Sequence, residues 1–284
     1  MITDQQTNFV YFSALLEKKA PVTFKQLASS FDQLGIGYGT LPLTKDLWAV
    51  DFMPIQVKED DFLQFEFDPD YYLGPTYSKL KTDPKLVWDA MNGDSQLLYR
   101  KVSLKMDGGN MVRLGNKVIV TTKVFTENKG WAEQNLIDEL GTLLGVEQVI
   151  VVPQEPGDIT GHSDGMVRFI NEHTVLVNQY PDTKKYKDFG YNFRWSLRNA
   201  GLQLVECPFT AWENKGYVDA TGCYINFLEV GNYIFYPVFG QQEDTLAEAV
   251  FRHSFPDREL ISIDCRDLAK QGGVLNCATW NVLK

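Results

Sequence analysis

One cysteine near the end of the sequence has surroundings that suit thiol chemistry. Cys277 follows the pair Gly272-Gly273 and a short apolar run. A glycine pair lets the backbone turn where a Cβ would clash, and we predict that the apolar run is a strand presenting the thiol at its end. A free cysteine is more often a buried apolar residue, so the rest of the chain must decide whether Cys277 is a nucleophile.

Polar residues recur along the chain at a steady interval. Asp51, Asp107, His162, Asn226 and Cys277 follow one another at spacings of 56, 55, 64 and 51 residues. Self-similarity at a fixed period predicts a repeat architecture. Five such units around an axis would bring all five positions to one mouth.

The residue types at this mouth indicate chemistry on a cation. With Asp164 beside His162, the set contains one thiol, one imidazole and three carboxylates. A thiol becomes a nucleophile when a base or a positive charge favours the thiolate. Carboxylates that share a pocket repel one another unless a cation joins them, and the donor fork of a guanidinium fits two carboxylates at a time. Singly, each residue has a structural interpretation; their combination predicts a site.

The elements that would position these residues alternate between strands and helices. Apolar residues at three- and four-residue spacing predict a helix over Pro21 to Leu34, and Asp83-Pro84 opens a helix predicted over Thr82 to Leu98. Residues Val112 to Phe125 predict a hairpin, whereas Leu41 to Ile55 reads as extended. Further helices are predicted over 131–144, 188–200 and 244–255, and strands over 7–16, 102–106, 149–152, 174–178, 202–206, 224–230, 233–239 and 259–263. Each unit therefore reads strand, polar residue, strand, helix, strand, and the fold class is α/β.

Composition argues against several classes of protein. The net charge of -10 over 284 residues does not suit a phosphate-binding surface. Four cysteines without CxxC spacing indicate neither a zinc cluster nor a disulfide scaffold. The sequence shows no signal peptide and no apolar stretch of membrane-spanning length. We expect a single catalytic domain over residues 1–284 in the cytoplasm, with no cofactor or metal and no nucleic-acid or membrane partner; nothing indicates an oligomeric state.

The motifs around these residues resemble those of the guanidino-group-modifying enzymes of the pentein fold. That family includes agmatine deiminases, arginine deiminases, peptidylarginine deiminases and amidinotransferases. The matching segments are Trp48-Ala49-Val50-Asp51, Asp107-Gly108-Gly109-Asn110, Gly161-His162-Ser163-Asp164 with Arg168-Phe169, Tyr224-Ile225-Asn226, and Gly272-Gly273 to Thr279. Together they span residues 48 to 280. Val50 and Asp107 depart from the arginine and glutamate that are common in deiminases.

The resemblance implies a five-repeat α/β propeller and a role for each residue. Cys277 would attack the guanidinium carbon, His162 would protonate the leaving amine and then activate water, and Asp107 would orient His162. The substrate would be held by Asp51, Asp164, Trp48, Asn226 and Arg168.

The function that follows is hydrolysis of a small cationic guanidino compound to a ureido product and ammonia. An amidinotransferase, in which an amine resolves the covalent adduct, stays open as an alternative. A catalytically silent pentein used as a binding scaffold is another. Agmatine, free arginine and peptidyl arginine all fit the motifs. Free arginine would require cationic groups facing its carboxylate, for which Arg100, Arg113 and Arg168 are the candidates.

Overall fold

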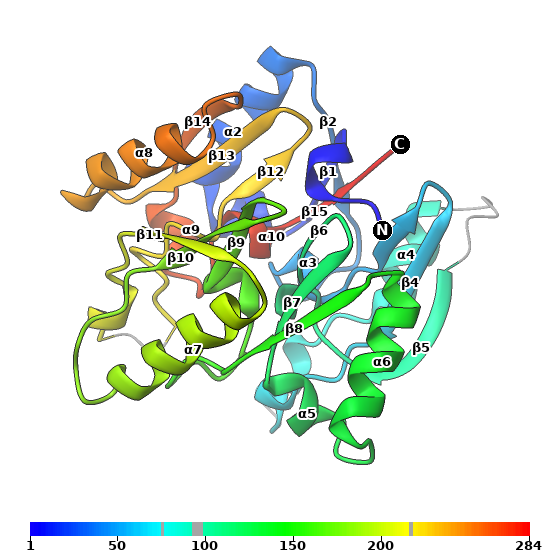
Figure 1. Ribbon diagram of the computed structural model, residues 1–284. Helices are drawn as coiled ribbons and strands as arrows, with labels where there is room; N and C mark the ends of the chain where they lie inside the picture. The colour runs from blue at the N-terminus through cyan, green and yellow to red at the C-terminus, as the bar shows by residue number, and fades with distance from the viewer. Residues whose placement is uncertain (75–76, 93–98, 216–217) are drawn as a thin grey trace.

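Five three-stranded sheets form the framework of the computed structural model, which describes residues 1–74, 77–92, 99–215 and 218–284. The sheets are arranged around a common centre, and the longer helices lie toward the outside (Figure 1). The strand orders are β15-β1-β2, β3-β4-β5, β6-β7-β8, β9-β10-β11 and β12-β13-β14. The five-repeat α/β architecture predicted from the sequence is therefore confirmed.

Each sheet combines an antiparallel pair with a third strand that is parallel to the middle one. The hairpin predicted within Val112 to Phe125 is confirmed as the β6–β7 pair, with Gly115-Asn116 between the two strands. The strand bounds are β1 (Phe9–Ser13), β2 (Gly37–Leu41), β3 (Ile55–Lys58), β4 (Asp61–Glu66), β5 (Tyr99–Lys105), β6 (Val112–Leu114), β7 (Lys117–Thr121), β8 (Gln148–Val152), β9 (Val167–Asn171), β10 (Thr174–Asn178), β11 (Gln203–Cys207), β12 (Leu228–Val230), β13 (Tyr233–Val238), β14 (Glu259–Asp264) and β15 (Thr279–Val282).

Helices connect the two parallel strands of every sheet, as a parallel pair requires. The helix predicted over 21–34 is confirmed with those bounds. The one predicted over Thr82 to Leu98 spans Pro84–Asn92: it begins two residues later than predicted, and residues 93–98 lie outside the described ranges. The connecting helices are α1 (Leu16–Lys19) and α2 (Pro21–Leu34), α4 (Pro84–Asn92), α5 (Lys123–Glu127) and α6 (Glu133–Leu144), α7 (Lys187–Asn199), and α8 (Glu243–Ser254).

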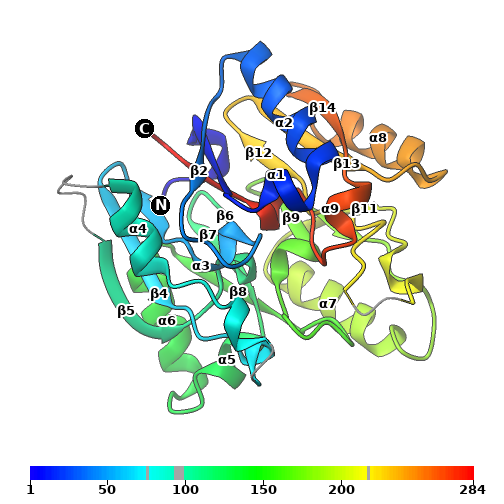
Figure 2. The ribbon, with the colours of Figure 1, turned by 180° about the vertical axis from the view of Figure 1, so that it is seen from behind.

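The two ends of the chain complete one sheet together. Strand β15 pairs antiparallel with β1, placing Trp280 opposite Tyr11. The indole Nε1 of Trp280 donates a hydrogen bond to the Pro54 carbonyl at 2.8 Å. The last strand therefore joins the first unit and also contacts the second, and both termini lie near this sheet (Figure 2).

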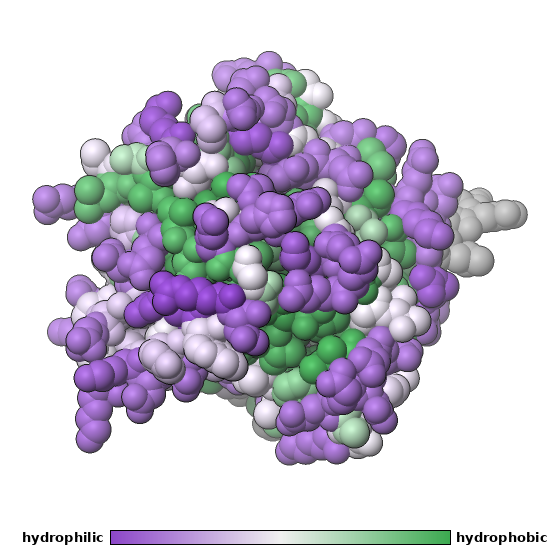
Figure 3. Space-filling view, in the orientation of Figure 1, coloured by the Kyte–Doolittle hydropathy of each residue, from purple (hydrophilic) through white to green (hydrophobic). Residues whose placement is uncertain are grey.

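Apolar side chains from the strands and the inner helix faces form the core. Leu27 and Phe31 of α2 are fully buried, and the Phe31 ring packs on Phe12 and Phe235 from two different sheets. Each such side chain contributes about 1.5–3 kcal/mol through burial. Hydrophilic residues dominate the periphery of the face drawn in Figure 3, with apolar residues visible between them. None of the helices in the described ranges has the length and hydropathy needed to cross a bilayer.

Three predicted extended segments are wrong. Residues Ala49–Phe52 form the one-turn helix α3 inside the run Leu41 to Ile55, and Leu275–Ala278 form the helix α10, so Cys277 lies in a helical turn before its strand. The strand predicted from Tyr224 begins only at Leu228. In α10, the backbone N–H groups of Asn276 and Cys277 bind the carbonyl and side-chain oxygens of Asn226, so they do not pair with a neighbouring strand. The polar residue of each unit therefore precedes the antiparallel pair.

Candidate active site

The predicted site residues lie on short turns that precede the first strand of a sheet. Asp51 is on α3 before β3, and Cys277 is on α10 before β15. Asp107 and His162 are the N-cap residues of η4 (Gly108–Asn110) and η5 (Ser163–Gly165), which precede β6 and β9. These turns pack against one another, α10 on α3, α3 on η4, and η4 on η5. Four sequence-distant units thus deliver their polar residues to one place.

His162 lies between two carboxylates. Its Nε2 is 3.0 Å from Asp107 Oδ2, and its Nδ1 is 3.6 Å from Asp51 Oδ1. All three side chains are buried. Asp51 Oδ1 also accepts a hydrogen bond from the Gly109 N–H at 2.9 Å. The imidazole is therefore oriented from both ring nitrogens.

The glycines that follow Asp107 are required by close approach. A Cβ on Gly109 would lie 2.6 Å from both Asp51 Oδ1 and His162 Nδ1. A Cβ on Gly108 would lie 1.9 Å from the Val50 carbonyl oxygen. Any larger residue at either position would push apart the turns that carry Asp51 and His162.

Cys277 contacts a different carboxylate. Its Sγ is 3.4 Å from Asp164 Oδ2, and the same oxygen accepts a hydrogen bond from Asn276 Nδ2 at 2.7 Å. The Cys277 N–H donates to Asn226 Oδ1 at 3.2 Å. Asp164 is buried, whereas Cys277 is partly exposed. The thiol therefore lies at the edge of the cluster beside an anionic group.

Trp48 covers the glycine pair that leads to Cys277. A Cβ on Gly273 would lie 2.6 Å from Trp48 Cζ3, inside the ring's van der Waals surface. The half-buried indole, at the N-cap of α3, thus packs directly against the backbone of the cysteine segment.

The buried negative charges shift the titration of the site. Burial opposes protonation of His162, but the carboxylates of Asp51, Asp107 and Asp164 prevail and raise its pKa to about 10. Burial, together with Asp107 and Asp164, raises the pKa of Asp51 well above its ordinary value. Burial and the charges of Asp164 and Asp51 raise the pKa of the Cys277 thiol. At neutral pH these residues by themselves therefore favour an imidazolium and a neutral thiol.

Arg168 does not join this cluster. Its guanidinium donates to the Phe227 carbonyl and to Asp4 Oδ2, both at 3.0 Å, and it stacks 4.4 Å from the Phe227 ring centroid. Asn226 contacts the backbone of α10. Of the predicted substrate-binding residues, Asp51, Asp164 and Trp48 thus lie beside the turns that carry Cys277 and His162. Asn226 instead binds the backbone of α10.

Three further residues of the site were missed in the sequence. Tyr71 donates its hydroxyl to Asp107 Oδ2 at 2.7 Å, and Asn276 contacts Asp164. Burial and the Asp107 charge raise the pKa of Glu127 to about 7. Asn276 could have been suspected because it precedes Cys277, but Tyr71 lies in an irregular connection without any motif.

Solved structures with the same fold define the class of this chain. It superimposes over its whole length on a substrate-bound agmatine deiminase from C. jejuni, covering 96% of that chain with a TM-score of 0.79 and 18% identity. It covers 100% of DDAH from Pseudomonas aeruginosa with a TM-score of 0.60 and 10% identity. These likenesses define the pentein fold. A family model for Porphyromonas-type peptidyl-arginine deiminase matches residues 8–282, and the chain belongs to that family.

Curated relatives are longer than the region they share with this chain. An agmatine deiminase from Pseudomonas fluorescens is 22% identical over 240 residues, 72% of this chain and 64% of its own. A Streptomyces coelicolor homologue is 27% identical over 200 residues, 65% of this chain and 58% of its own. The matched region thus spans less than two thirds of these relatives.

Proposed function

We propose that this chain is a guanidino-group hydrolase, a deiminase whose single catalytic domain comprises residues 1–284. The observation that carries the proposal is the convergence of Cys277, His162 and three aspartates from four units at one cluster. Membership of the peptidyl-arginine deiminase family supports it. Because no lysine or arginine among the described residues makes an ion pair with Asp51, Asp107 or Asp164, the cluster suits a cationic ligand.

The placement of these groups supports the following reaction. The Cys277 thiolate attacks the guanidinium carbon, and a C–S bond forms. The C–N bond to one amino group then breaks, and His162 gives the departing nitrogen its proton. Water, activated by His162, adds to the same carbon and the thiolate leaves. The balance is one guanidinium and one water converted to one ureido group and one ammonium ion.

The positive charge of the substrate supplies the activation that the protein's own residues do not. The thiol is disfavoured as a thiolate by burial and by the charges of Asp164 and Asp51. A guanidinium bound between those carboxylates would offset part of their negative charge and lower the pKa of the thiol. Asp51 and Asp164 would thus hold the substrate, and the substrate's charge would favour formation of the thiolate. Trp48 would be the apolar wall beside it, and Asn226 would act through the backbone of α10.

The arginines of this chain favour an agmatine-type substrate over free arginine. Arg100 pairs with Asp61, and both Arg113 and Arg168 pair with Asp4. None of the three candidates for binding a substrate carboxylate is therefore free to do so. Free arginine would bring an unpaired carboxylate of its own near the buried aspartates. A guanidino compound whose other end is neutral or cationic would not.

A product screen tests the proposed function. Agmatine, free arginine and a blocked peptidyl arginine would be incubated with the protein, and both ammonia and the ureido product would be measured, with Cys277→Ala as the blank. We expect equimolar products, with the highest kcat/KM for agmatine and no need for an acceptor amine. Full turnover by Cys277→Ala would exclude the nucleophile, whereas product formation only with an added amine would identify an amidinotransferase.

A further inference from the structure

A tyrosine from the β4–α4 connection contacts the catalytic pair. Tyr71 belongs to the short turn η2 (Asp70–Tyr72). Its hydroxyl donates to Asp107 Oδ2 at 2.7 Å, the same oxygen that lies 3.0 Å from His162 Nε2. Its ring also packs edge-on against the His162 ring, with centroids 6.0 Å apart at 76°. Tyr71 therefore restrains both members of the pair at once.

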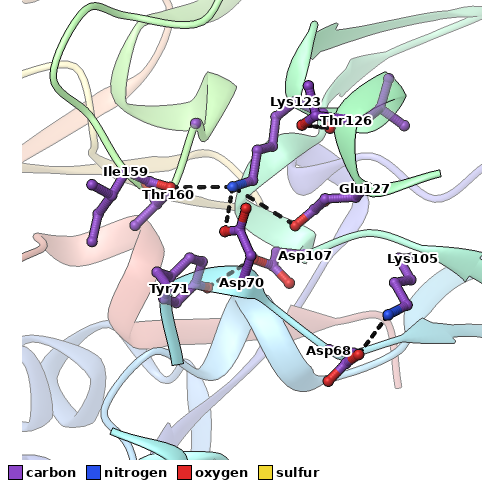
Figure 4. A network of polar contacts seen from close by, with 12 residues as sticks. Asp68, Asp70, Tyr71, Lys105, Asp107, Lys123, Thr126, Glu127, Ile159 and Thr160 are labelled. Carbon is purple, nitrogen blue, oxygen red and sulfur yellow. Dashed lines mark hydrogen bonds and ion pairs between the residues drawn. The ribbon is translucent and has the colours of Figure 1, made fainter. Parts of the chain in front are cut away.

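Ion pairs fix the chain just before Tyr71. Asp70 Oδ1 lies 2.5 Å from the Nζ of Lys123 on α5, and Asp68 pairs with Lys81 and Lys105 at 2.6 and 2.5 Å. Figure 4 shows Asp70 and Tyr71 pointing in different directions from this turn, toward Lys123 and Asp107 respectively. The chain is thus anchored immediately before Tyr71, at Asp70 and at Asp68.

Lys123 connects this turn to the segment that carries His162. Its side chain is only 5% exposed, and its Nζ also donates to the Ile159 carbonyl at 3.3 Å. A Cβ on Gly161 would meet Lys123 Cβ at 3.0 Å, so the lysine stem packs against the residue before His162. Glu127, 4.0 Å from Nζ, is the second carboxylate beside this ammonium. One buried cation therefore joins both turns that contact Asp107.

We propose that Tyr71 is a positioning residue for the Asp107–His162 pair, and that the Asp70–Lys123 ion pair holds Tyr71 in place. Tyr71 and His162 both bind the same oxygen of Asp107, so each of the two hydrogen bonds is weaker than it would be alone. Without the tyrosine hydroxyl, Asp107 would hold the His162 proton more tightly. A stronger hydrogen bond from Nε2–H to Asp107 makes the imidazole ring more basic. His162 must give a proton from its other ring nitrogen to the leaving amine, so a more basic ring slows the chemical step without weakening substrate binding.

The catalytic part of this inference rests on the proposed function, but the effect on His162 does not. The groups that face His162 from the surrounding elements are Asp51 of α3, Asp107 before η4, Asp164 of η5, Glu127 of α5 and Tyr71 of η2. Replacing Tyr71 by phenylalanine leaves every carboxylate in this set, so a change in His162 reports the missing hydroxyl.

The test is an NMR titration of histidine-labelled Tyr71→Phe protein without substrate, alongside steady-state kinetics. The chain has three histidines, so His162 can be assigned with a single His162→Gln reference. We expect the pKa of His162 to rise by about half a unit to one unit, and kcat to fall about tenfold with KM within about twofold. Tyr72→Phe, which changes the neighbouring ring, is the matched control and should match the unmodified protein in both measurements.

A second variant tests the anchor. Asp70→Asn should lower kcat in the same direction, and the double variant Asp70→Asn/Tyr71→Phe should be no slower than Tyr71→Phe alone, because the ion pair acts through the tyrosine. An unchanged His162 titration in Tyr71→Phe would overturn the positioning role, even if no substrate is turned over. Additive losses in the double variant would overturn the role of Lys123 and Asp70 in holding the tyrosine.

Discussion

Two groups of charged residues lie at the centre of this molecule, and they differ in how many positive charges accompany their carboxylates. The catalytic cluster consists of Asp51, Asp107, His162, Asp164 and Cys277. The arginine cluster consists of Asp4, Arg113, Arg168, Glu229 and Arg258. In the arginine cluster each carboxylate has a guanidinium partner, since Asp4 pairs with Arg168 and Arg113, and Glu229 pairs with Arg258. In the catalytic cluster, three carboxylates share one imidazole.

The two groups meet at the turns that carry the catalytic cluster. A cavity of about 30 Å³ is lined by every member of the arginine cluster except Arg258, and also by Val50, Gly108 and Asn276. Each of these three residues is the sequence neighbour of a catalytic-cluster residue, Asp51, Asp107 or Cys277. The turns of the catalytic cluster therefore border the arginine cluster as well, although the Asn276 side chain itself donates a hydrogen bond to Asp164.

The difference shows what each region can do. Where carboxylates meet guanidiniums of the same chain, each carboxylate already has a cationic partner. These ion pairs join Asp4 of the N-terminal segment to β6 and β9, and join Glu229 of β12 to Arg258. Where carboxylates do not meet guanidiniums, burial leaves excess negative charge that raises the pKa of both His162 and Cys277. A cation from outside is the missing partner there. The two groups should consequently respond to mutation in different ways.

Loss of the thiol or the imidazole should have the largest effect. Cys277→Ala and His162→Gln should each lower kcat/KM by at least about ten-thousandfold, because nucleophile and proton donor act as a unit. Thermal unfolding followed by circular dichroism should stay close to that of the unmodified protein for Cys277→Ala. Substantial turnover by either variant would break the assignment of this cluster to catalysis.

Removing a carboxylate from the catalytic cluster should weaken cation binding. A charge-assisted hydrogen bond contributes about 1.5–3 kcal/mol, so Asp164→Asn should lower kcat/KM by about 10- to 150-fold for each such hydrogen bond to the substrate. Calorimetric binding of guanidinium, the cationic group of the proposed substrate, to Cys277→Ala protein, with and without Asp164→Asn, measures the binding part alone. Equal affinities in the two proteins would contradict a role for Asp164 in holding the substrate.

Breaking the arginine cluster should affect stability and leave substrate binding unchanged. Arg168→Met removes the partner of a partly buried Asp4 carboxylate and of the Phe227 carbonyl. We expect the free energy of unfolding in urea to fall by about 3 kcal/mol, with KM unchanged within about twofold. The double variant Asp4→Asn/Arg168→Met should recover part of the loss. A large rise in KM without loss of stability would instead indicate that Arg168 binds the substrate.

The thiol itself should report the excess negative charge. Because burial, Asp164 and Asp51 raise the pKa of Cys277, alkylation by iodoacetamide should be slow at pH 8 and should accelerate as pH rises. Asp164→Asn removes one negative charge, so it should lower this pKa and speed labelling at pH 8 by about tenfold. Mass spectrometry separates Cys277 from the buried Cys207, Cys223 and Cys265, and the exposed Asp138→Asn serves as a control. An unchanged rate would show that Asp164 does not influence the thiol.

The repeated units could be predicted from the sequence because the spacing of apolar residues within a helix or strand is a local property of the chain. Three- and four-residue spacing of apolar residues predicted the helix Pro21–Leu34, and strand-forming residues around a Gly-Asn turn predicted the hairpin within Val112 to Phe125. The interval between polar residues predicted five units. The short turns were not readable. Residues 274–280 are apolar and β-branched enough for a strand, but Asn226, about 50 residues earlier in the chain, binds the N–H groups of Asn276 and Cys277 and favours one helical turn.

The candidate site residues could likewise be predicted from their chemical types, whereas the direction in which their side chains point depended on the fold. The sequence by itself determined the repeat architecture and the set of thiol, imidazole and carboxylates, because these follow from local pattern and chemistry. Only the tertiary structure decided that Arg168 pairs with Asp4 and that Tyr71 binds Asp107. Both interactions join segments far apart in the chain. Packing between units decides which side chains of a one-turn segment point toward the thiol. The secondary-structure propensity of the segment itself does not specify this.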